Sequence, residues 1–184
     1  MMEMLFVLYD GFVEYEYTIP LLALLYHRVP CETVGLEGRE VTGLVGLRAF
    51  TKKTVAEVDS KGYKGLVLPG VAREKREGLL RDERLLGLIR EFDEDKKIVA
   101  GVCGGVAILG AAGVLRGKRF CSDVKEHPVF EGAIRVEGPA VRDGHVVTGL
   151  GARVFAFAAE LLEAVVGREA ATDYRRWAGL REER

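Results

Sequence analysis

The segment IVAGVCGGVAILGAAGVL, residues 98–115, decides the fold. Its first five residues, Ile98–Val102, form the most apolar short run of the chain and predict a buried strand. A helix is expected from Gly105 to about Ala112, so the chain must turn sharply at Cys103. Glycines on both sides of Cys103 allow the strand and the helix to cross closely, with the sulfur raised on the turn. The pattern G-x-C-x-G is the cysteine form of a nucleophile elbow.

Further apolar runs alternate with helical patterns along the chain. Strands are expected at Met4–Tyr9, Glu32–Leu36, Gly43–Phe50, Gly65–Leu68, Arg119–Cys121 and in a hairpin at Val141–Thr148. Helices are expected at Tyr15–Tyr26, Asp82–Phe92, Val154–Val166 and, in a polar tail, Ala170–Arg184. Several strands are continuously apolar, which indicates a parallel sheet buried on both faces. We therefore predict one doubly wound α/β domain over residues 1–184, with a mostly parallel sheet and helices on both faces.

The composition sets limits on partners and location. The chain has 184 residues, a net charge of −1, 48% apolar and 30% charged residues, so it lacks the basic excess that binds a nucleic-acid backbone. The start, MMEMLFVLYDGF, has no basic segment before its apolar run, and no apolar run approaches the length of a membrane span. We expect a cytoplasmic protein that binds neither nucleic acid nor membrane.

Two absences narrow the chemistry. The chain contains no Asn and no Gln, a pattern typical of proteins that work at high temperature, and its only serines are Ser60 and Ser122. No side-chain amide can therefore line an oxyanion hole, and neither serine lies in a G-x-S-x-G setting. The three cysteines form no C-x-x-C pair, so we expect no disulfide framework, no metal site and no cofactor.

Cys103 is the best candidate nucleophile. In a doubly wound sheet the functional site lies beyond the carboxyl ends of the strands, where Cys103 is expected. The first N–H groups of the following helix, at Gly104 and Gly105, favour a thiolate and can bind an oxyanion. The alternative is an inert cysteine in a tight junction. Cys31 and Cys121 are interpreted as small apolar residues, with a resolving thiol as the second possibility for Cys121.

Four segments in order resemble the ThiJ/PfpI superfamily. They are LFVLYDGFVEYEYTIPL, GLVLPG, IVAGVCGGVAILGAAGVLRGKRF and VRDGHVVTGLGARVFAFAAELLEAV. The resemblance covers residues 1–167 and leaves 168–184 as a predicted helical extension. It implies a flavodoxin-like fold of the class I glutamine amidotransferase type. Members include the parkinsonism-associated deglycase, PfpI-type intracellular proteases, and chaperone-like and isonitrile-hydrating proteins.

The resemblance also implies site residues. It aligns Glu16 with a glutamate that accompanies the elbow cysteine, and we expect this carboxyl to be protonated and to donate a hydrogen bond to the sulfur. Backbone N–H groups of Gly70, Val71 and Gly104 would form the oxyanion hole, although Val71 replaces the usual second glycine. Together these donors predict that the pKa of Cys103 lies well below about 8.5.

The histidines of the family are not at their usual places. Gly104 stands where PfpI-type proteases carry a histidine, which counts against proteolysis. Asp123 takes the position of the histidine found in other members, and His127 follows four residues later, so a loop shift could bring His127 to the thiol with Asp123 orienting it. His27 and His145 are interpreted as structural.

The sequence leaves three functions as hypotheses. The first is an enzyme in which Cys103 attacks a small reactive carbonyl or acyl substrate, with Glu16 and His127 moving protons, as in a glyoxalase- or deglycase-like hydrolase or lyase. The alternatives are a redox-responsive or chaperone-like stress protein that uses oxidation of Cys103, or a PfpI-type peptidase. Apolar residues of the first helix and of the tail, among them Leu22, Tyr174 and Trp177, further predict a two-fold homodimer or a larger assembly.

Overall fold

The computed structural model describes residues 2–180 and is built around a seven-stranded sheet. The strand order is β10-β11-β7-β6-β1-β2-β5, and every neighbouring pair is parallel except β10 and β11. These strands are β1 (Glu3–Leu8), β2 (Cys31–Gly35), β5 (Lys53–Thr54), β6 (Tyr63–Leu68), β7 (Ile98–Val102), β10 (Ala140–Asp143) and β11 (Val146–Gly149). The sequence prediction of a mostly parallel doubly wound sheet is confirmed.

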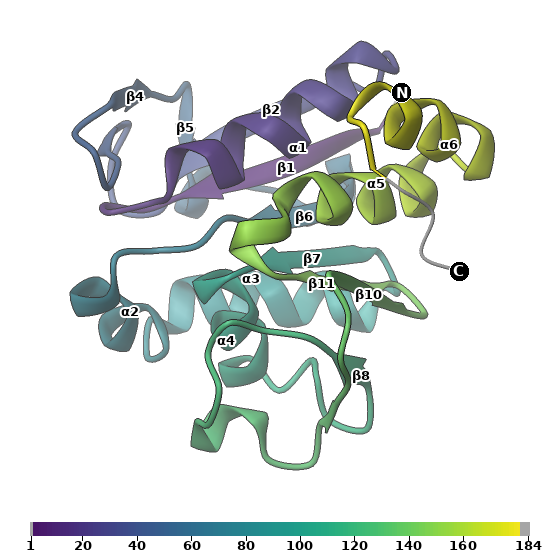
Figure 1. Ribbon diagram of the computed structural model, residues 1–184. Coiled ribbons are helices and arrows are strands. Elements are labelled where there is room, and N and C mark those ends of the chain that lie inside the picture. The colour runs from purple at the N-terminus through teal and green to yellow at the C-terminus, as the bar shows by residue number, and fades with distance from the viewer. Residues whose placement is uncertain (1, 181–184) are drawn as a thin grey trace.

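Helices cover both faces of this sheet (Figure 1). One face carries α3 (Glu83–Glu94) and α4 (Gly104–Ala111), and the other carries α1 (Glu14–Tyr26) and α5 (Val154–Val165). The short helix α2 (Arg73–Leu79) follows β6, and α6 (Arg168–Trp177) packs on the outer side of α5. Because both faces are covered, the central strands β1, β6 and β7 are buried almost throughout.

The helix patterns explain these positions. In α3 the buried residues recur on one side, at Leu85, Ile89 and Phe92, and Asp82 caps the helix by accepting from two backbone N–H groups. In α4 every residue from Gly104 to Gly110 is buried, as expected for a helix that is apolar all round. The part of α4 next to β7 therefore lies deep inside the molecule.

Smaller elements lie at the rim. They are the antiparallel pair β3 (Glu40–Thr42) and β4 (Arg48–Phe50), the parallel pair β8 (Arg119–Phe120) and β9 (Ile134–Arg135), and four 3-10 turns: η1 (Val55–Glu57), η2 (Ser60–Gly62), η3 (Pro128–Phe130) and η4 (Gly151–Arg153). The pairing of β9 with β8 is absent from the sequence prediction.

The expected helical tail is partly described. Helix α6 ends at Trp177, and residues 181–184 of the predicted tail lie outside the described residues. Tyr174 is buried against α5, and Arg175 pairs with Glu160 at 2.7 Å, so α6 packs on its own domain. Within residues 2–180 no helix has the length and apolar character needed to cross a membrane.

Candidate functional site around Cys103

Cys103 lies at the tip of a strained turn between β7 and α4. Its backbone has φ 53° and ψ −120°, a conformation that non-glycine residues adopt rarely and at a cost of about 1–3 kcal/mol. The Cys103 N–H donates to the Gly149 carbonyl oxygen at 2.9 Å, which ties the turn to β11. The strand–turn–helix geometry expected from the sequence is therefore present.

The glycines around Cys103 are required by close backbone contacts. A Cβ on Gly105 would lie 2.5 Å from the Leu68 carbonyl oxygen, and a Cβ on Gly101 would lie 3.0 Å from the backbone of Gly105. A Cβ on Gly104 would lie 3.2 Å from the Val71 backbone nitrogen. The missing side chains let α4 start directly against β7 and the end of β6, as the sequence indicates.

Glu16 brings a buried carboxyl group to the sulfur. It lies in the first turn of α1 and is only 1% exposed. Its Oε2 accepts from the Gly70 N–H at 2.8 Å, and its Oε1 accepts from the Tyr15 hydroxyl at 3.1 Å. The carboxyl and the thiol of Cys103 are neighbours, because both lie against Gly70 and Gly151, and each shifts the pKa of the other.

Two glycines make room for this pair. A Cβ on Gly70 would collide with Glu16 Oε2 and lie 3.2 Å from Cys103 Sγ, and a Cβ on Gly151 would collide with Glu16 Oε1 and lie 3.3 Å from the same sulfur. Gly70 follows β6, and Gly151 follows β11. The carboxyl ends of four strands, β1, β6, β7 and β11, thus converge on one thiol–carboxyl pair.

The three predicted backbone donors have different roles. The Gly70 N–H is occupied by Glu16, so it positions the carboxyl group instead of facing a substrate. Val71 and Phe12 form an isolated antiparallel β-bridge. Its two hydrogen bonds run from the Val13 N–H to the Gly70 carbonyl oxygen and from the Ala72 N–H to the Gly11 carbonyl oxygen, so the bridge does not use the Val71 N–H. The Gly104 N–H lowers the pKa of the neighbouring Cys103 thiol. Val71 and Gly104 therefore remain as candidate oxyanion donors.

The expectation of a lowered thiol pKa is wrong. Burial and the negative charges of Glu16 and Asp123 raise the pKa of Cys103 to about 12, against the lowering effect of the Gly104 N–H. Burial also raises the pKa of Glu16, although hydrogen bonds from Gly70, Tyr15 and Cys103 act in the opposite direction. Cys103 and Glu16 titrate as a coupled pair, and both of their pKa values are raised, so the pair releases its proton less readily than the isolated groups would. A thiolate forms most easily when this proton sits on Glu16, because a neutral carboxyl no longer opposes the charge on sulfur.

Asp123, and not His127, lies at the site. Asp123 Oδ2 accepts from the Gly151 N–H at 2.7 Å, and its charge acts on Cys103, Glu16 and Tyr15. The structure does not bring His127 to the thiol. Its Nδ1 accepts from the Val129 N–H at 3.4 Å, and its Nε2 lies 3.4 Å from Glu77 of α2. The loop shift considered from the sequence does not occur.

The other two cysteines have different surroundings. Cys121 is buried, and its sulfur lies 3.6 Å from the carbonyl oxygen of Thr148, while Cys31 lies at the start of β2 with its thiol directed to the Val29 carbonyl oxygen at 3.4 Å. Burial raises the pKa of Cys31 to about 12 and that of Cys121 above its ordinary value. Within residues 2–180 no group of three or more His, Cys, Asp or Glu side chains is arranged to hold a metal ion.

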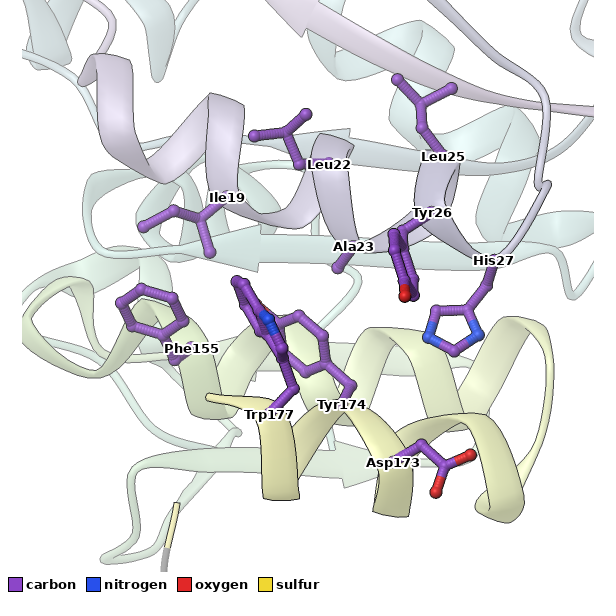
Figure 2. A pocket seen from close by; sticks show the side chains of 10 residues that line it. All are labelled: Ile19, Leu22, Ala23, Leu25, Tyr26, His27, Phe155, Asp173, Tyr174 and Trp177. Carbon is purple, nitrogen blue, oxygen red and sulfur yellow. The ribbon is translucent and has the colours of Figure 1, made fainter. Parts of the chain in front are cut away.

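An apolar cavity of about 670 Å³ lies away from Cys103, between α1 and α6. Figure 2 shows Tyr174 and Trp177 of α6 facing Ile19 and Ala23 of α1, with Phe155 of α5 beside them. The lining is almost entirely hydrocarbon and aromatic, and none of the site residues named above belongs to it.

Comparison with known proteins identifies the family. Residues 2–164 match the DJ-1/PfpI family. The chain belongs to this family. The deglycase of Pyrococcus horikoshii is 30% identical over 80% of this chain and 89% of its own length. The isonitrile hydratase of Pseudomonas putida is 38% identical, but over 50% of this chain and 42% of its own length. An uncharacterised protein of Methanocaldococcus jannaschii is 30% identical over 68% of this chain, which spans 63% of that relative.

Solved structures share the fold. A DJ-1 superfamily protein from Agrobacterium tumefaciens superimposes with a TM-score of 0.85 at 28% identity, covering 97% of this chain and 98% of that one. A DJ-1 superfamily protein from Salmonella typhimurium also gives a TM-score of 0.85 at 23% identity, covering 98% and 100%. The resemblance to the ThiJ/PfpI superfamily that the sequence indicates is therefore confirmed.

The sequence did not single out the tyrosines around the pair. The Tyr9 hydroxyl donates to the Pro69 carbonyl oxygen and supports the segment that carries Gly70, while Tyr15 binds Glu16 directly. Both tyrosines have raised pKa values, first through burial and then through the charge of Glu16. Tyr15 stands next to Glu16 in the EYEY segment at the start of α1, which was an available signal, whereas no local pattern marks Tyr9.

Proposed function

We propose that this member of the DJ-1/PfpI family is a cysteine-dependent enzyme in which Cys103 attacks a small reactive carbonyl, such as that of an α-oxoaldehyde or a glycated adduct. The observation that carries the proposal is the pair itself: a cysteine at φ 53° beside a carboxyl group that is 1% exposed. Both features reduce the stability of the fold, and features of this kind gather at functional sites.

The chemistry follows from the shared proton. With the proton on Glu16, the sulfur of Cys103 adds to the carbonyl carbon, the C=O π electrons move to oxygen, and this oxygen takes the proton from Glu16. In this proposal the Val71 and Gly104 N–H groups donate to the developing oxyanion. With methylglyoxal as substrate, the hydrogen on the attacked carbon moves to the neighbouring ketone carbon, which is reduced to the alcohol as the attacked carbon is oxidised to a thioester. Water then cleaves the S–C bond of the thioester, which releases lactate and the free thiol, so one water is added overall.

The site favours carbonyl addition over peptide hydrolysis. Hydrolysis of an amide needs a group that protonates the leaving amine, a role for which a histidine is the usual choice. Gly104 stands directly after Cys103, and the ring of His127 is directed to Glu77 and Val129. The relatives named deglycases, which align over most of their length, support the same preference.

The test is lactate production from methylglyoxal by wild type, Cys103→Ala and Cys121→Ala. We expect a loss of at least about 10²-fold in Cys103→Ala because the nucleophile is gone, and little change in Cys121→Ala because that thiol packs against Thr148. An inactive wild type whose Cys103 oxidises selectively to a sulfinate would overturn the enzyme and favour the redox-responsive alternative.

A further inference from the structure

Asp123 is an acidic side chain placed next to the thiol by a backbone link. Its Oδ2 accepts from the Gly151 N–H at 2.7 Å, and Gly151 packs so closely on the pair that a Cβ there would lie 3.3 Å from Cys103 Sγ. Gly151 therefore contacts both the Asp123 carboxylate and the thiol–carboxyl pair. Asp123 is exposed, whereas Glu16 is enclosed.

Arg135 holds the backbone of the segment that carries Asp123 but does not pair with the Asp123 carboxylate. The guanidinium of Arg135 donates to the carbonyl oxygens of Ser122, Val124 and Lys125, at 2.9, 2.6 and 2.6 Å. Within residues 2–180 no lysine, arginine or histidine forms a salt bridge with Asp123. Arg135 thus fixes the backbone on both sides of Asp123 without pairing with its carboxylate.

The charge reaches the reacting groups. Asp123 contributes to raising the pKa of Cys103, of Glu16 and of Tyr15. The two charged groups that oppose ionisation of Cys103, Glu16 and Asp123, are both acidic. With the proton on Glu16, the Asp123 carboxylate remains as the acidic charge beside the sulfur, and an electrophile that approaches the sulfur meets this charge.

We infer that Asp123 is a specificity-determining residue, whose carboxylate selects against electrophiles that carry a negative charge beside the reacting carbon and favours neutral or cationic ones. This inference rests on the proposed function in that it assigns the substrate class of the same site. Neutral α-oxoaldehydes and adducts that carry an ammonium group are accepted, and α-keto acids of the same size are disfavoured. A single charge at this separation, partly screened by water, corresponds to a discrimination of about three- to tenfold.

The test uses two alkylating reagents that differ only in charge. Iodoacetamide is neutral and iodoacetate is an anion; in both, the S–C bond forms as iodide leaves with the electrons of the C–I bond. The rate constant for Cys103 is followed by mass spectrometry of its peptide, and the iodoacetamide-to-iodoacetate ratio is divided by that of the urea-unfolded chain. Because both reagents react with the same thiolate, a changed pKa of Cys103 cancels in this ratio.

The variants are Asp123→Asn and, as a control, Glu126→Gln. Asn keeps an acceptor for the Gly151 N–H, and Glu126 is an exposed carboxylate on the same segment. At low ionic strength we expect the ratio to be above one in wild type, to fall about three- to tenfold in Asp123→Asn, and to stay unchanged in Glu126→Gln. Salt at about 0.5 M should reduce the wild-type ratio, because the Debye length falls below 5 Å.

The inference and the proposed function fail in different ways. An unchanged ratio in Asp123→Asn, or an equal fall in Glu126→Gln, overturns the role of Asp123 even when methylglyoxal is consumed. A ratio that falls only in Asp123→Asn supports that role even when methylglyoxal is not consumed, in which case the proposed reaction is wrong. A Cys103 that reacts with neither reagent contradicts both.

Discussion

The two halves of α1 meet opposite environments. The first turn carries Glu16, a charged residue that is 1% exposed and packed against a thiol, whereas the second half carries Leu22 and Tyr26, apolar residues that are 63% and 85% exposed. Each half reverses the usual rule that charged groups face water and apolar groups face the core. The carboxyl group of Glu16 accepts hydrogen bonds from Gly70 and Tyr15. Leu22 and Tyr26 line an open apolar cavity (Figure 2).

Burying the Glu16 carboxyl and exposing Leu22 and Tyr26 differ in their cost in free energy. Burying a carboxyl group costs free energy unless its hydrogen bonds are satisfied, so the surroundings of Glu16 had to be built around it. A scattered exposed leucine costs little and needs no explanation, but several beside one cavity indicate a covered surface. Changes in the first half of α1 should therefore have large, specific effects, and changes in the second half small ones.

The largest effect is expected from Gly151→Ala. The new Cβ collides with Glu16 and approaches Cys103 Sγ to 3.3 Å, so the thiol–carboxyl pair must move apart. We expect loss of methylglyoxal turnover by at least about 10²-fold, with a destabilisation of about 1–3 kcal/mol in urea unfolding. Gly87→Ala in α3 is the matched control. Open space surrounds its Cβ, and it should keep activity and gain up to about 1 kcal/mol.

A second large effect concerns the shared proton. Glu16→Gln removes a negative charge beside Cys103, so the pKa of the thiol, raised to about 12 in wild type, should fall. Gln cannot pass a proton to a substrate oxygen, so turnover should fall by about 10²–10⁴-fold although more thiolate is present. Iodoacetamide labelling against pH and the lactate assay measure the two changes separately. Turnover that rises with the thiolate fraction would show that Glu16 moves no proton.

A moderate effect is expected in the pH dependence of stability. Burial raises the pKa of Glu16 above the 4.5 of an ordinary glutamate, so between these two values the native state binds more protons than the unfolded state. The free energy of unfolding therefore falls as pH rises, by at most about 1.4 kcal/mol for each pH unit of that interval. In Glu16→Gln this slope should be absent. In thermal melts from pH 4 to pH 8, the Tm of Glu16→Gln should therefore rise relative to that of wild type as pH increases. The Tm of the exposed control Glu126→Gln should show the same pH dependence as wild type.

The smallest effect is expected in the apolar half. Leu22→Ala alters a side chain that is 63% exposed and should change the free energy of unfolding by less than about 0.5 kcal/mol. We still expect a homodimer or larger assembly, because Leu22, Tyr26 and Trp177 expose apolar surface together. Light scattering at micromolar concentration should therefore give at least twice the 20.2 kDa mass of the chain. A monomer under these conditions contradicts the assembly.

The sequence predicted the parts of the site that depend on local pattern. The glycines around Cys103 predicted the turn because close backbone crossing permits no other residue, and the apolar run Ile98–Val102 predicted β7. Glu16 came from resemblance to a family, since nothing local distinguishes it from Glu14. These predictions concern residues whose environment is set by the chain immediately around them.

The parts that were missed depend on long-range contacts. The segment after β8 has no helical or strand period, and its course is fixed by Arg135 and by the bond from Gly151 to Asp123. The resemblance aligned Asp123 with the family's histidine, but sequence spacing could not decide against the loop shift that would have brought His127 to the thiol. The thiol pKa was misjudged for the same reason: the start of α4 is visible in the sequence, but the burial of Cys103 and the second carboxylate are not.

The convergence of four strand ends has a consequence for folding. Glu16, Gly70, Cys103 and Gly151 span most of the chain, so no fragment can assemble the pair before β11 joins β7. Contacts between such distant positions are formed late, because the chain entropy lost in closing long loops must be offset first. Until then Cys103 and Glu16 stay apart, and a nascent or damaged chain lacks the thiol–carboxyl pair on which the proposed reaction depends. The proposed reaction of Cys103 therefore requires a chain in which β11 has already joined the sheet.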